Sequence, residues 1–301
     1  MALRIAFPPV IRGILWMLGA SLTGSVMSTL VRHATVDLHP FEVAFLRSVF
    51  GVLFMLPWLL TAGRESLRTT RYGLYFWRTV IAAISMIAWF YGVAFVPLAE
   101  ATALGFTAPL FATVMAALFL REVIRIRRWS ATVIGFLGVL VIVRPGWHPI
   151  DVPTLAVLLS SVAAAFSVLI IKRLSRTESA NAIVAYTMIF LTPITLVAAI
   201  PVWTTPSWYD LAIAAAIGFI GTIGNICMTR SLAATDTSAV LPFEYVRLPL
   251  VALVAYLAFG EVPDVFVWIG GVIIAASSIY IAHREATLAR EKVRPPAAKR
   301  E

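Results

Sequence analysis

The chain has 301 residues, of which 60% are hydrophobic and only 13% are charged, and its mean hydropathy is +0.92. A soluble domain is about half apolar and about a quarter charged, so this chain has too little polar surface to cover a globule in water. Its formal charge is +9, and its single cysteine, Cys227, excludes an intramolecular disulfide and a cysteine-based metal cluster.

Ten apolar segments follow one another along the chain, and most approach the roughly 20 residues that a helix needs to cross a bilayer. They cover residues 13–31, 41–60, 72–95, 99–120, 129–143, 155–171, 182–202, 211–228, 239–259 and 265–282. Arg4 and Arg12 precede the first segment, as in a signal peptide, but no clear small-residue cleavage site follows, which favours a retained helix. The sequence therefore predicts an all-α integral membrane protein with ten transmembrane helices.

The basic residues indicate the orientation of these helices. With the N-terminus placed inside, nineteen Lys and Arg residues fall on the inner side, two on the outer side, and three within spans. Such a bias predicts that both termini are cytoplasmic. It also explains the positive charge as an orientation signal, so nucleic acid is not an expected partner. The basic tail, residues 284–301, is expected to be disordered or to lie near anionic headgroups.

The two halves of the sequence resemble each other. Residues 118–129, LFLREVIRIRRW, match residues 257–268, LAFGEVPDVFVW, and just upstream Pro109 pairs with Pro249. Because each copy holds five spans, an odd number, the second copy must enter the membrane with opposite polarity, as in many secondary transporters. We therefore expect a first repeat at residues 1–148 and an inverted second repeat at residues 149–283.

These paired segments, with FEVAFLRSVFGVLFMLP in the second span and VPLAEATALGFTAPLF entering the fourth, resemble the EamA-type members of the drug/metabolite transporter superfamily. The stretches PLAEATALGFTAPLF and LPFEYVRLPL look most like a branch of S-adenosylmethionine and riboflavin carriers. The resemblance implies ten helices with inverted symmetry, a central cavity and transport of a small organic solute. One departure is Arg121, where the second repeat keeps the usual glycine as Gly260.

The ninth span contains a carboxylate and a guanidinium, Glu244 and Arg247, which share one helix face. Charged groups within a span are costly and indicate function by default. One interpretation is a binding site in which Arg247 faces a carboxylate and Glu244 faces an amine, a sulfonium or a proton. The alternative is that the two charges only neutralise each other and hold the bundle together. The first repeat has Leu104 and Thr107 at these positions, which favours function.

Other charges within the spans are weighed in the same way. Arg47 is expected to face the protein interior, where it either pairs structurally or binds an anion. For Arg78 we favour a side chain that extends to the inner headgroups. Glu100, near the outer end of the fourth span, is a second candidate for a proton site beside Glu244. The repeat-paired Glu122 and Glu261 are interpreted as structural.

Aromatic and polar residues complete the predicted site. Rings within the spans can stack on a flat solute or meet a cation, although packing explains most of them equally well. The candidate substrate-binding residues, beside Glu244, Arg247 and Arg47, are Trp16, Trp89, Tyr91, Tyr186, Asn225 and Tyr245. Pro109 and Pro249 each remove a helical hydrogen bond, so they mark either gating points or static kinks.

The sequence contains neither the GxxxxGK[ST] loop of ATP-driven proteins nor an HExxH metal motif. We therefore predict a secondary carrier of the cytoplasmic (inner) membrane, not an enzyme, with no metal and no cofactor. Its cavity is expected between parts of the first, third, fourth, sixth, eighth and ninth spans. The expected solute is S-adenosylmethionine-, riboflavin- or amino-acid-like. Alternatives are an exporter driven by proton antiport, an intramembrane enzyme or a scaffold, and a homodimer stays open.

Overall fold

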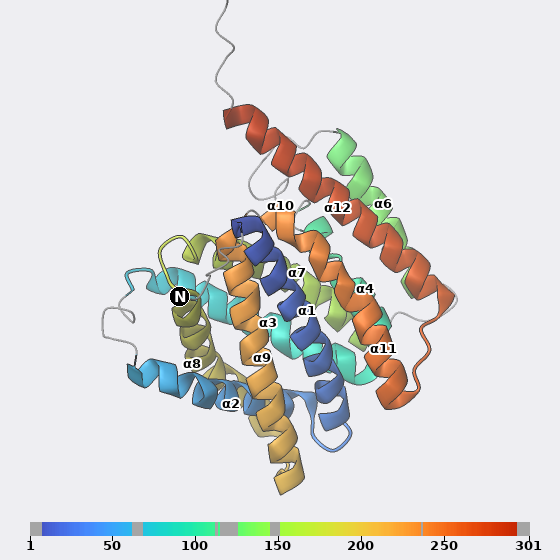
Figure 1. Ribbon diagram of the computed structural model, residues 1–301. Coiled ribbons are helices and arrows are strands. Elements are labelled where there is room, and N and C mark those ends of the chain that lie inside the picture. Colours follow the sequence, from blue (N-terminus) through green and yellow to red (C-terminus); the bar gives the residue numbers. More distant parts are fainter. Residues whose placement is uncertain are drawn as a thin grey trace, which may run out of the picture.

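The computed structural model describes residues 8–61, 69–111, 114, 126–144, 151–235 and 237–293. All of the secondary structure in these residues is helical, and the elements pack into one bundle (Figure 1). The helices are α1 (Pro9–Ala34), α2 (Pro40–Thr61), α3 (Tyr72–Phe95), α4 (Leu98–Gly105), α6 (Ile126–Val143), α7 (Val152–Leu174), α8 (Ala180–Ala199), η2 (Ile200–Val202), α9 (Trp208–Ala234), α10 (Thr237–Val240), η3 (Leu241–Val246), α11 (Arg247–Phe259) and α12 (Val265–Val293).

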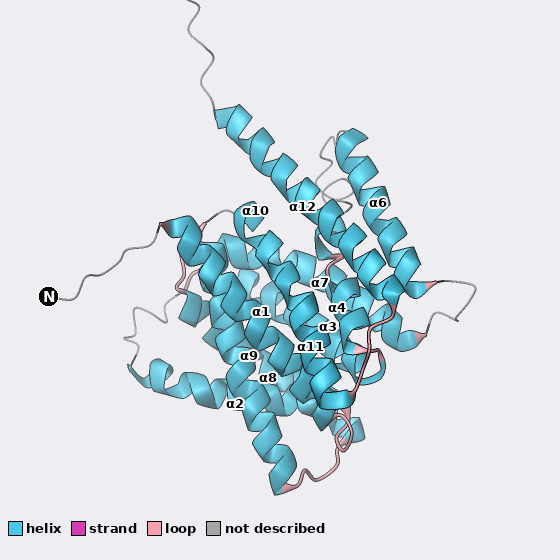
Figure 2. Ribbon diagram, turned by 45° about the vertical axis from the view of Figure 1, so that its right-hand side comes forward, coloured by secondary structure: helices cyan, strands magenta, loops and turns pink. Residues whose placement is uncertain are grey.

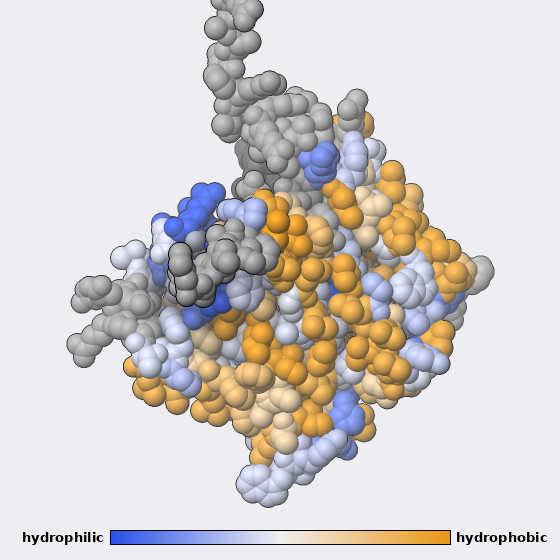
Figure 3. All heavy atoms as spheres, viewed as in Figure 1, coloured by the Kyte–Doolittle hydropathy of each residue, from blue (hydrophilic) through white to orange (hydrophobic). Residues whose placement is uncertain are grey.

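The predicted all-α membrane fold is confirmed in its class. Within the described residues, α1, α2, α3, α7, α8 with η2, and α9 are long and apolar enough to cross a membrane. Shorter apolar helices cover Leu98–Phe111, Trp129–Val143 and Val265–Ile281. Large apolar side chains cover the middle of the face in Figure 3, while hydrophilic residues gather toward its edges. The count of ten spans stays a prediction, and most of the predicted fourth span after residue 111 lies outside the described residues.

Side-chain caps begin three helices of the second half. Ser207 and Asp210 form a capping box at the start of α9, in which each side chain accepts a hydrogen bond from the other residue's backbone. Asp151 accepts from the backbone N–H of Thr154 at the start of α7, and Ser179 does the same for α8. A cap satisfies N–H groups that have no partner within the helix. These polar residues therefore define where each apolar helix starts.

The largest helix contacts join the two halves of the chain. The helix α1 packs most extensively on α9, and α3 packs similarly on α7. If α1 corresponds to α7 and α3 to α9, as the sequence repeat implies, these two contacts become the same contact with the halves exchanged. The contacts of α2 with α9 and of α3 with α8 form a second such pair. Figure 2 shows α1 and α9 side by side in the bundle.

Two glycines allow α6 and α12 to cross at close range. A Cβ atom added to Gly270 would lie 2.6 Å from the carbonyl oxygen of Gly138, and one added to Gly138 would lie 2.9 Å from that of Gly270. Both distances are too short for a real side chain next to backbone. Small residues at such crossings let helices pack where no hydrophobic effect separates helix from lipid.

Two helices are broken near their prolines. The helix α4 ends at Gly105, and a turn at Phe106 and Thr107 precedes the next helical residues, while η3 ends at Val246 directly before α11. A proline removes the hydrogen bond to the carbonyl four residues earlier, which is residue 105 for Pro109 and residue 245 for Pro249. The ninth predicted span, expected as one helix over residues 239–259, is therefore α10, η3 and α11 in succession.

Candidate substrate cavity

A cavity of about 440 Å³ lies inside the bundle, between the two halves of the chain. This volume falls within the range of small-molecule sites. The predicted spans contribute through α1, α3, α4, α7, α9 and the η3–α11 segment. The lining also includes the predicted binding residue Arg47 of α2, three residues of α8 and Ile281 of α12, so the predicted set of lining spans was too narrow.

Arg247 lines this cavity at the start of α11. Its guanidinium donates a hydrogen bond of 3.0 Å to the hydroxyl of Ser28 and lies 5.2 Å from the ring centroid of Trp89. It can lie flat on α1 because Gly24 has no side chain, and a Cβ atom there would be 3.3 Å from the guanidinium carbon. The Nε atom is buried and has no hydrogen-bond partner among the described residues. Arg247 is thus held by neutral groups and keeps an unused donor.

Glu244 lines the same cavity from η3. The structure shows no hydrogen bond and no ion pair between its carboxylate and any described residue, Arg247 included. The two charges influence each other electrostatically without direct contact.

Arg47 and Arg78 bring two further guanidinium groups into the cavity. The side chain of Arg47 contacts the sulfur atoms of Met86 at 3.0 Å and Met188 at 3.8 Å, and thioether sulfur is a weak acceptor. Arg78 makes no hydrogen bond or ion pair with a described residue. It is 7% exposed, which corrects the expectation that its side chain extends to the headgroups. An arginine within a span is the sequence signal that could have indicated Arg78 as a site residue.

Hydroxyl groups from other helices donate to carbonyls next to the helix break. The hydroxyl of Ser161 in α7 donates to the carbonyl of Leu104 at 3.3 Å, and that of Ser278 in α12 donates to the carbonyl of Phe106 at 3.4 Å. Irregular backbone within a membrane needs such partners, or a cavity, because lipid offers none. The break is therefore part of the cavity wall and is supported from the second half of the chain.

The predicted site residues divide into two groups. The structure brings six of the predicted binding residues, together with the kink residue Pro109, to the cavity. They are Glu244, Arg247, Tyr245, Arg47, Trp89 and Asn225.

The remaining candidates do not line the cavity. Trp16 lies under the guanidinium of Arg230, with 4.8 Å from the guanidinium carbon to the ring centroid. Tyr91 packs against Phe41 and Phe95, and Tyr186 against Tyr75 and Phe190, so packing accounts for both.

Glu100 and Pro249 also lie away from the cavity lining. The charges that act on Glu100 are those of Asp151, Arg144 and Asp264, at the end of the bundle where α6 finishes and α7 begins. Pro249 is exposed on α11. The predicted roles of Glu100 in proton transfer and of Pro249 in gating stay predictions.

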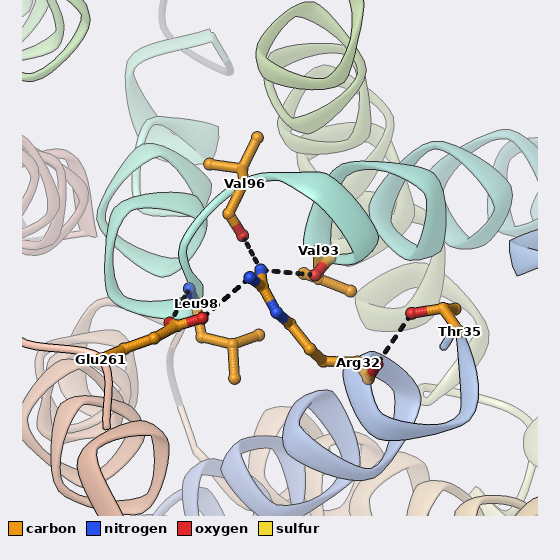
Figure 4. Close-up of polar contacts among 6 residues, drawn as sticks. All are labelled: Arg32, Thr35, Val93, Val96, Leu98 and Glu261. Atoms are coloured by element: carbon orange, nitrogen blue, oxygen red, sulfur yellow. Dashed lines mark hydrogen bonds and ion pairs between the residues drawn. The ribbon is translucent and has the colours of Figure 1, made fainter. Parts of the chain in front are cut away.

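A polar cluster closes the bundle at the last turn of α1 (Figure 4). The guanidinium of Arg32 forms an ion pair of 2.8 Å with Glu261 and donates to the carbonyls of Val93 at 3.2 Å and Val96 at 2.6 Å. The second carboxylate oxygen of Glu261 accepts from the backbone N–H of Leu98 at 3.1 Å. This cluster, which we call the Arg32 latch, ties α1 and the α3–α4 connection to the α11–α12 connection.

A related arrangement involves Lys172, which lies 140 residues after Arg32. Its ammonium group donates to the carbonyls of Leu232 and Thr235, both at 2.6 Å. Like Arg32, it is a cation in the last turn of its helix that reaches two carbonyls at the end of another helix of its own half. Neither residue was predicted from the sequence, although the 140-residue offset of the repeat pairs them. Glu122, which the repeat pairs with Glu261, lies outside the described residues.

Comparison with known proteins agrees with this architecture. Residues 11–144 and residues 153–282 each match the EamA-like transporter family. A solved crystal structure that carries no functional description aligns with a TM-score of 0.62 at 17% identity, covering 94% of this chain and 99% of that chain. At this identity the likeness concerns the fold alone.

Three relatives illustrate the range of named activities. An S-adenosylmethionine uptake transporter of Rickettsia prowazekii is 30% identical over 280 residues, covering 93% of this chain and 95% of the relative. A riboflavin transporter of Vibrio cholerae is 33% identical over 290 residues, covering 94% and 96%. A pseudopaline exporter of Pseudomonas aeruginosa is 32% identical over 280 residues, covering 90% and 95%.

Proposed function

The chain belongs to the EamA-like transporter family, and from this premise we propose that it is a secondary carrier that moves a small, partly charged metabolite through its central cavity. It is a multi-pass protein of the cell membrane, and its relatives are named as metabolite transporters. The proposed solute carries a carboxylate and a cationic group, as S-adenosylmethionine and amino acids do, or a flat ring, as riboflavin does.

The observation that carries this proposal is the separation of Glu244 and Arg247 in one cavity. A direct ion pair between them would satisfy both charges and leave nothing for a ligand. Instead, the carboxylate has no polar partner among the described residues and the guanidinium keeps a free Nε donor beside the ring of Trp89. Arg247 can therefore bind an anionic group, and Glu244 an amine, a sulfonium or a proton. Trp89 offers a face for a ring or a cation.

Two observations support alternating access about this cavity. The contacts between the halves come in pairs that exchange when the halves are exchanged, as two inverted repeats require. In addition, the cavity lining in α1 runs from Met17 to Met27, while the Arg32 latch lies beyond it at the end of that helix. We infer that this conformation is closed on the side of the latch and that transport requires the latch to open.

The direction of transport has two candidates. Uptake follows from the relatives named as S-adenosylmethionine uptake transporters, and export from the relative named as a pseudopaline exporter. Export by proton antiport would give Glu244 the role of the proton site, since it is the acidic residue among the described lining residues. An intramembrane enzyme or a scaffold is less well supported, because the described cavity presents charges suited to binding a solute.

A thermal-shift screen followed by transport assays tests the proposal. A ligand that binds only the folded protein raises its stability by mass action. The purified protein is screened against S-adenosylmethionine, riboflavin and amino acids, and each stabilising solute is then tested for flux into proteoliposomes. The proposal predicts saturable flux for a stabilising solute. If a solute binds the cavity and no flux occurs in either direction, the protein is not a carrier for that solute class.

A further inference from the structure

Arg47 and Arg78 are the charged residues of the cavity that the proposed Glu244–Arg247 site does not use. They are 5% and 7% exposed, and the Nε atom of each is buried without a hydrogen-bond partner in the part of the chain that the structure describes. A buried charge is strongly unfavourable unless it is paired, so a buried arginine normally has a carboxylate or several carbonyls beside it. Neither Arg47 nor Arg78 pairs with a carboxylate or a carbonyl among the described residues. Their guanidinium groups can therefore bind a group that enters the cavity.

The surroundings of Arg47 hold its guanidinium against the cavity wall. A Cβ atom added to Gly221 of α9 would lie 2.9 Å from the Nε atom of Arg47, so the side chain fits because this residue is glycine. Its hydrogen-bond partners are the sulfur atoms of Met86 and Met188, which are soft, weak acceptors. The guanidinium is therefore fixed in place by groups that do not neutralise it.

The charges of Arg47 and Arg78 repel each other within the same cavity. They come from neighbouring helices, α2 and α3. Their mutual repulsion is unfavourable when the cavity holds no anion. An anionic group placed between them would reverse this repulsion. Arginine is also the side chain whose planar fork matches carboxylate and phosphate oxygens.

We propose that Arg47 and Arg78 form a second subsite, which binds an anionic oxygen group of the transported solute. Three guanidinium groups and one carboxylate line the described cavity, so a solute that balances them carries more negative than positive charge. The inference rests on the proposed transport function and narrows it. The solute is an organic acid with a cationic group at Glu244, one anionic group at Arg247, and another carboxylate, phosphate or sulfate at Arg47 and Arg78.

Paired ligands test this subsite on the purified full-length protein at constant ionic strength. L-serine offers one carboxylate and one amine, O-phospho-L-serine adds a second anionic group to the same backbone, and inorganic phosphate offers that group alone. Affinities are measured by ligand-dependent changes in tryptophan fluorescence and by thermal shift. We expect O-phosphoserine to bind about tenfold more tightly than serine, the gain of one charge-assisted contact. Phosphate alone should also bind.

Variants decide whether any anion preference belongs to these residues. Arg47→Gln and Arg78→Gln should each remove the preference for O-phosphoserine and weaken phosphate binding, while Arg230→Gln, an exposed arginine outside the cavity, should change neither. Gly221→Ala provides a second route, because its methyl group displaces the Arg47 side chain while its charge remains. Equal binding of serine and O-phosphoserine, or a preference that survives in both Gln variants, would overturn the subsite.

The outcomes separate this inference from the transport proposal. If the subsite is wrong and the carrier is real, solute flux persists and shows no preference for the more acidic member of a ligand pair. If the subsite is right and the carrier function is wrong, phosphate binding depends on Arg47 and Arg78 while no bound solute is transported.

Discussion

Arg247 and Arg230 allow a direct comparison, because each guanidinium lies over a tryptophan ring at about the same distance. The separations are 5.2 Å from Arg247 to Trp89 and 4.8 Å from Arg230 to Trp16. The two residues differ in that Arg247 lines the cavity and Arg230 is exposed. A loss of function specific to Arg247 would therefore depend on its position, since both arginines make the same kind of ring contact.

Arg247→Ala should weaken binding of the solute identified by screening by about tenfold to a hundredfold, because it removes charge-assisted contacts of roughly 1.5–3 kcal/mol. Arg230→Ala is the matched control and should leave the affinity within about twofold, as expected for an exposed contact. Isothermal titration of both variants measures the effect. An unchanged affinity in Arg247→Ala would remove this residue from the binding site.

Glu244→Gln tests the proton site. If transport is coupled to a proton bound by this carboxylate, the wild-type rate depends on pH and the Gln variant, which cannot titrate, loses that dependence. Glu100→Gln tests the second candidate proton site: if Glu100 carries the proton instead, this variant loses the pH dependence and Glu244→Gln keeps it. The measurement is the initial rate of flux across a pH series. A Glu244→Gln profile that matches the wild type would exclude Glu244 from coupling.

At this scale the sequence identified charges within the spans but not their surroundings. It predicted Glu244, Arg247 and Arg47 as site residues from the cost of burying charge, and the structure brings all three to the cavity. It misassigned Arg78, because a long side chain near a helix end can extend to the headgroups or turn inward. The choice depends on neighbouring helices, which hydropathy along the chain does not reveal.

Among the elements, the Arg32 latch makes a prediction about conformational change. Arg32→Gln removes the ion pair to Glu261, and a partly exposed pair contributes up to ~1 kcal/mol, or about fivefold in a two-state population. The variant should therefore favour opening at the latch side. Met27→Cys, in a Cys227→Ser background, places a reporter thiol at the cavity lining. In the Arg32→Gln protein, we expect this cysteine to react severalfold faster with an impermeant maleimide added from the latch side than it does when the latch is intact.

Arg144→Gln is the control for the latch, because it breaks a more exposed ion pair, that of Arg144 with Asp264 at 2.7 Å. It should leave the labelling rate of the reporter cysteine close to that of the protein with both pairs intact. Equal labelling in the Arg32→Gln and Arg144→Gln proteins would mean that the latch does not control access to the cavity.

The crossing of α6 and α12 makes a prediction about stability. Gly270→Leu forces a side chain into a position 2.6 Å from the carbonyl oxygen of Gly138, and such overpacking costs about 1–3 kcal/mol. Gly73→Leu is the matched control, because a Cβ atom at Gly73 has no neighbour within 4 Å. Thermal unfolding in detergent should show a clear drop in Tm for Gly270→Leu only. A Tm equal to that of the control would show that the helices can separate at no cost.

The prediction of spans from hydropathy did not reveal where helices break. Hydropathy treats residues 239–259 as one apolar run, and it therefore predicted one helix. In the structure, the 3₁₀ segment η3 precedes α11, which begins two residues before Pro249, and α4 ends about one turn before Pro109. The prolines predicted the positions of weakness, but the hydroxyls of Ser161 and Ser278, which support the first break, come from distant helices.

For the whole molecule, composition alone was enough to predict a helical membrane protein, because lipid is the one solvent that suits such an apolar chain. Residues 11–144 and residues 153–282 each match one family, while the predicted bounds and inversion of the two repeats stay predictions. In Figure 1 the start of α1 and the end of α12 lie at the same end of the bundle. The orientation in the membrane and the homodimer stay predictions.

Solute identity belongs to this scale as well, because it depends on the charge of the complete cavity. The sequence weighed charges one span at a time and predicted a solute with mixed charge. The assembled cavity combines three arginines from α2, α3 and α11 with one glutamate from η3. This balance, which needs the folded bundle, is the reason for expecting an acidic solute.

The most direct test of the account is solute exchange in proteoliposomes, with the stabilising solute from the screen loaded unlabelled inside and labelled outside. The account predicts saturable exchange by the wild-type protein and exchange at least about tenfold slower at low solute concentration with Arg247→Ala. Exchange that is absent despite binding, or that proceeds equally fast in the wild type and the Arg247→Ala variant, would contradict a carrier that works through this cavity.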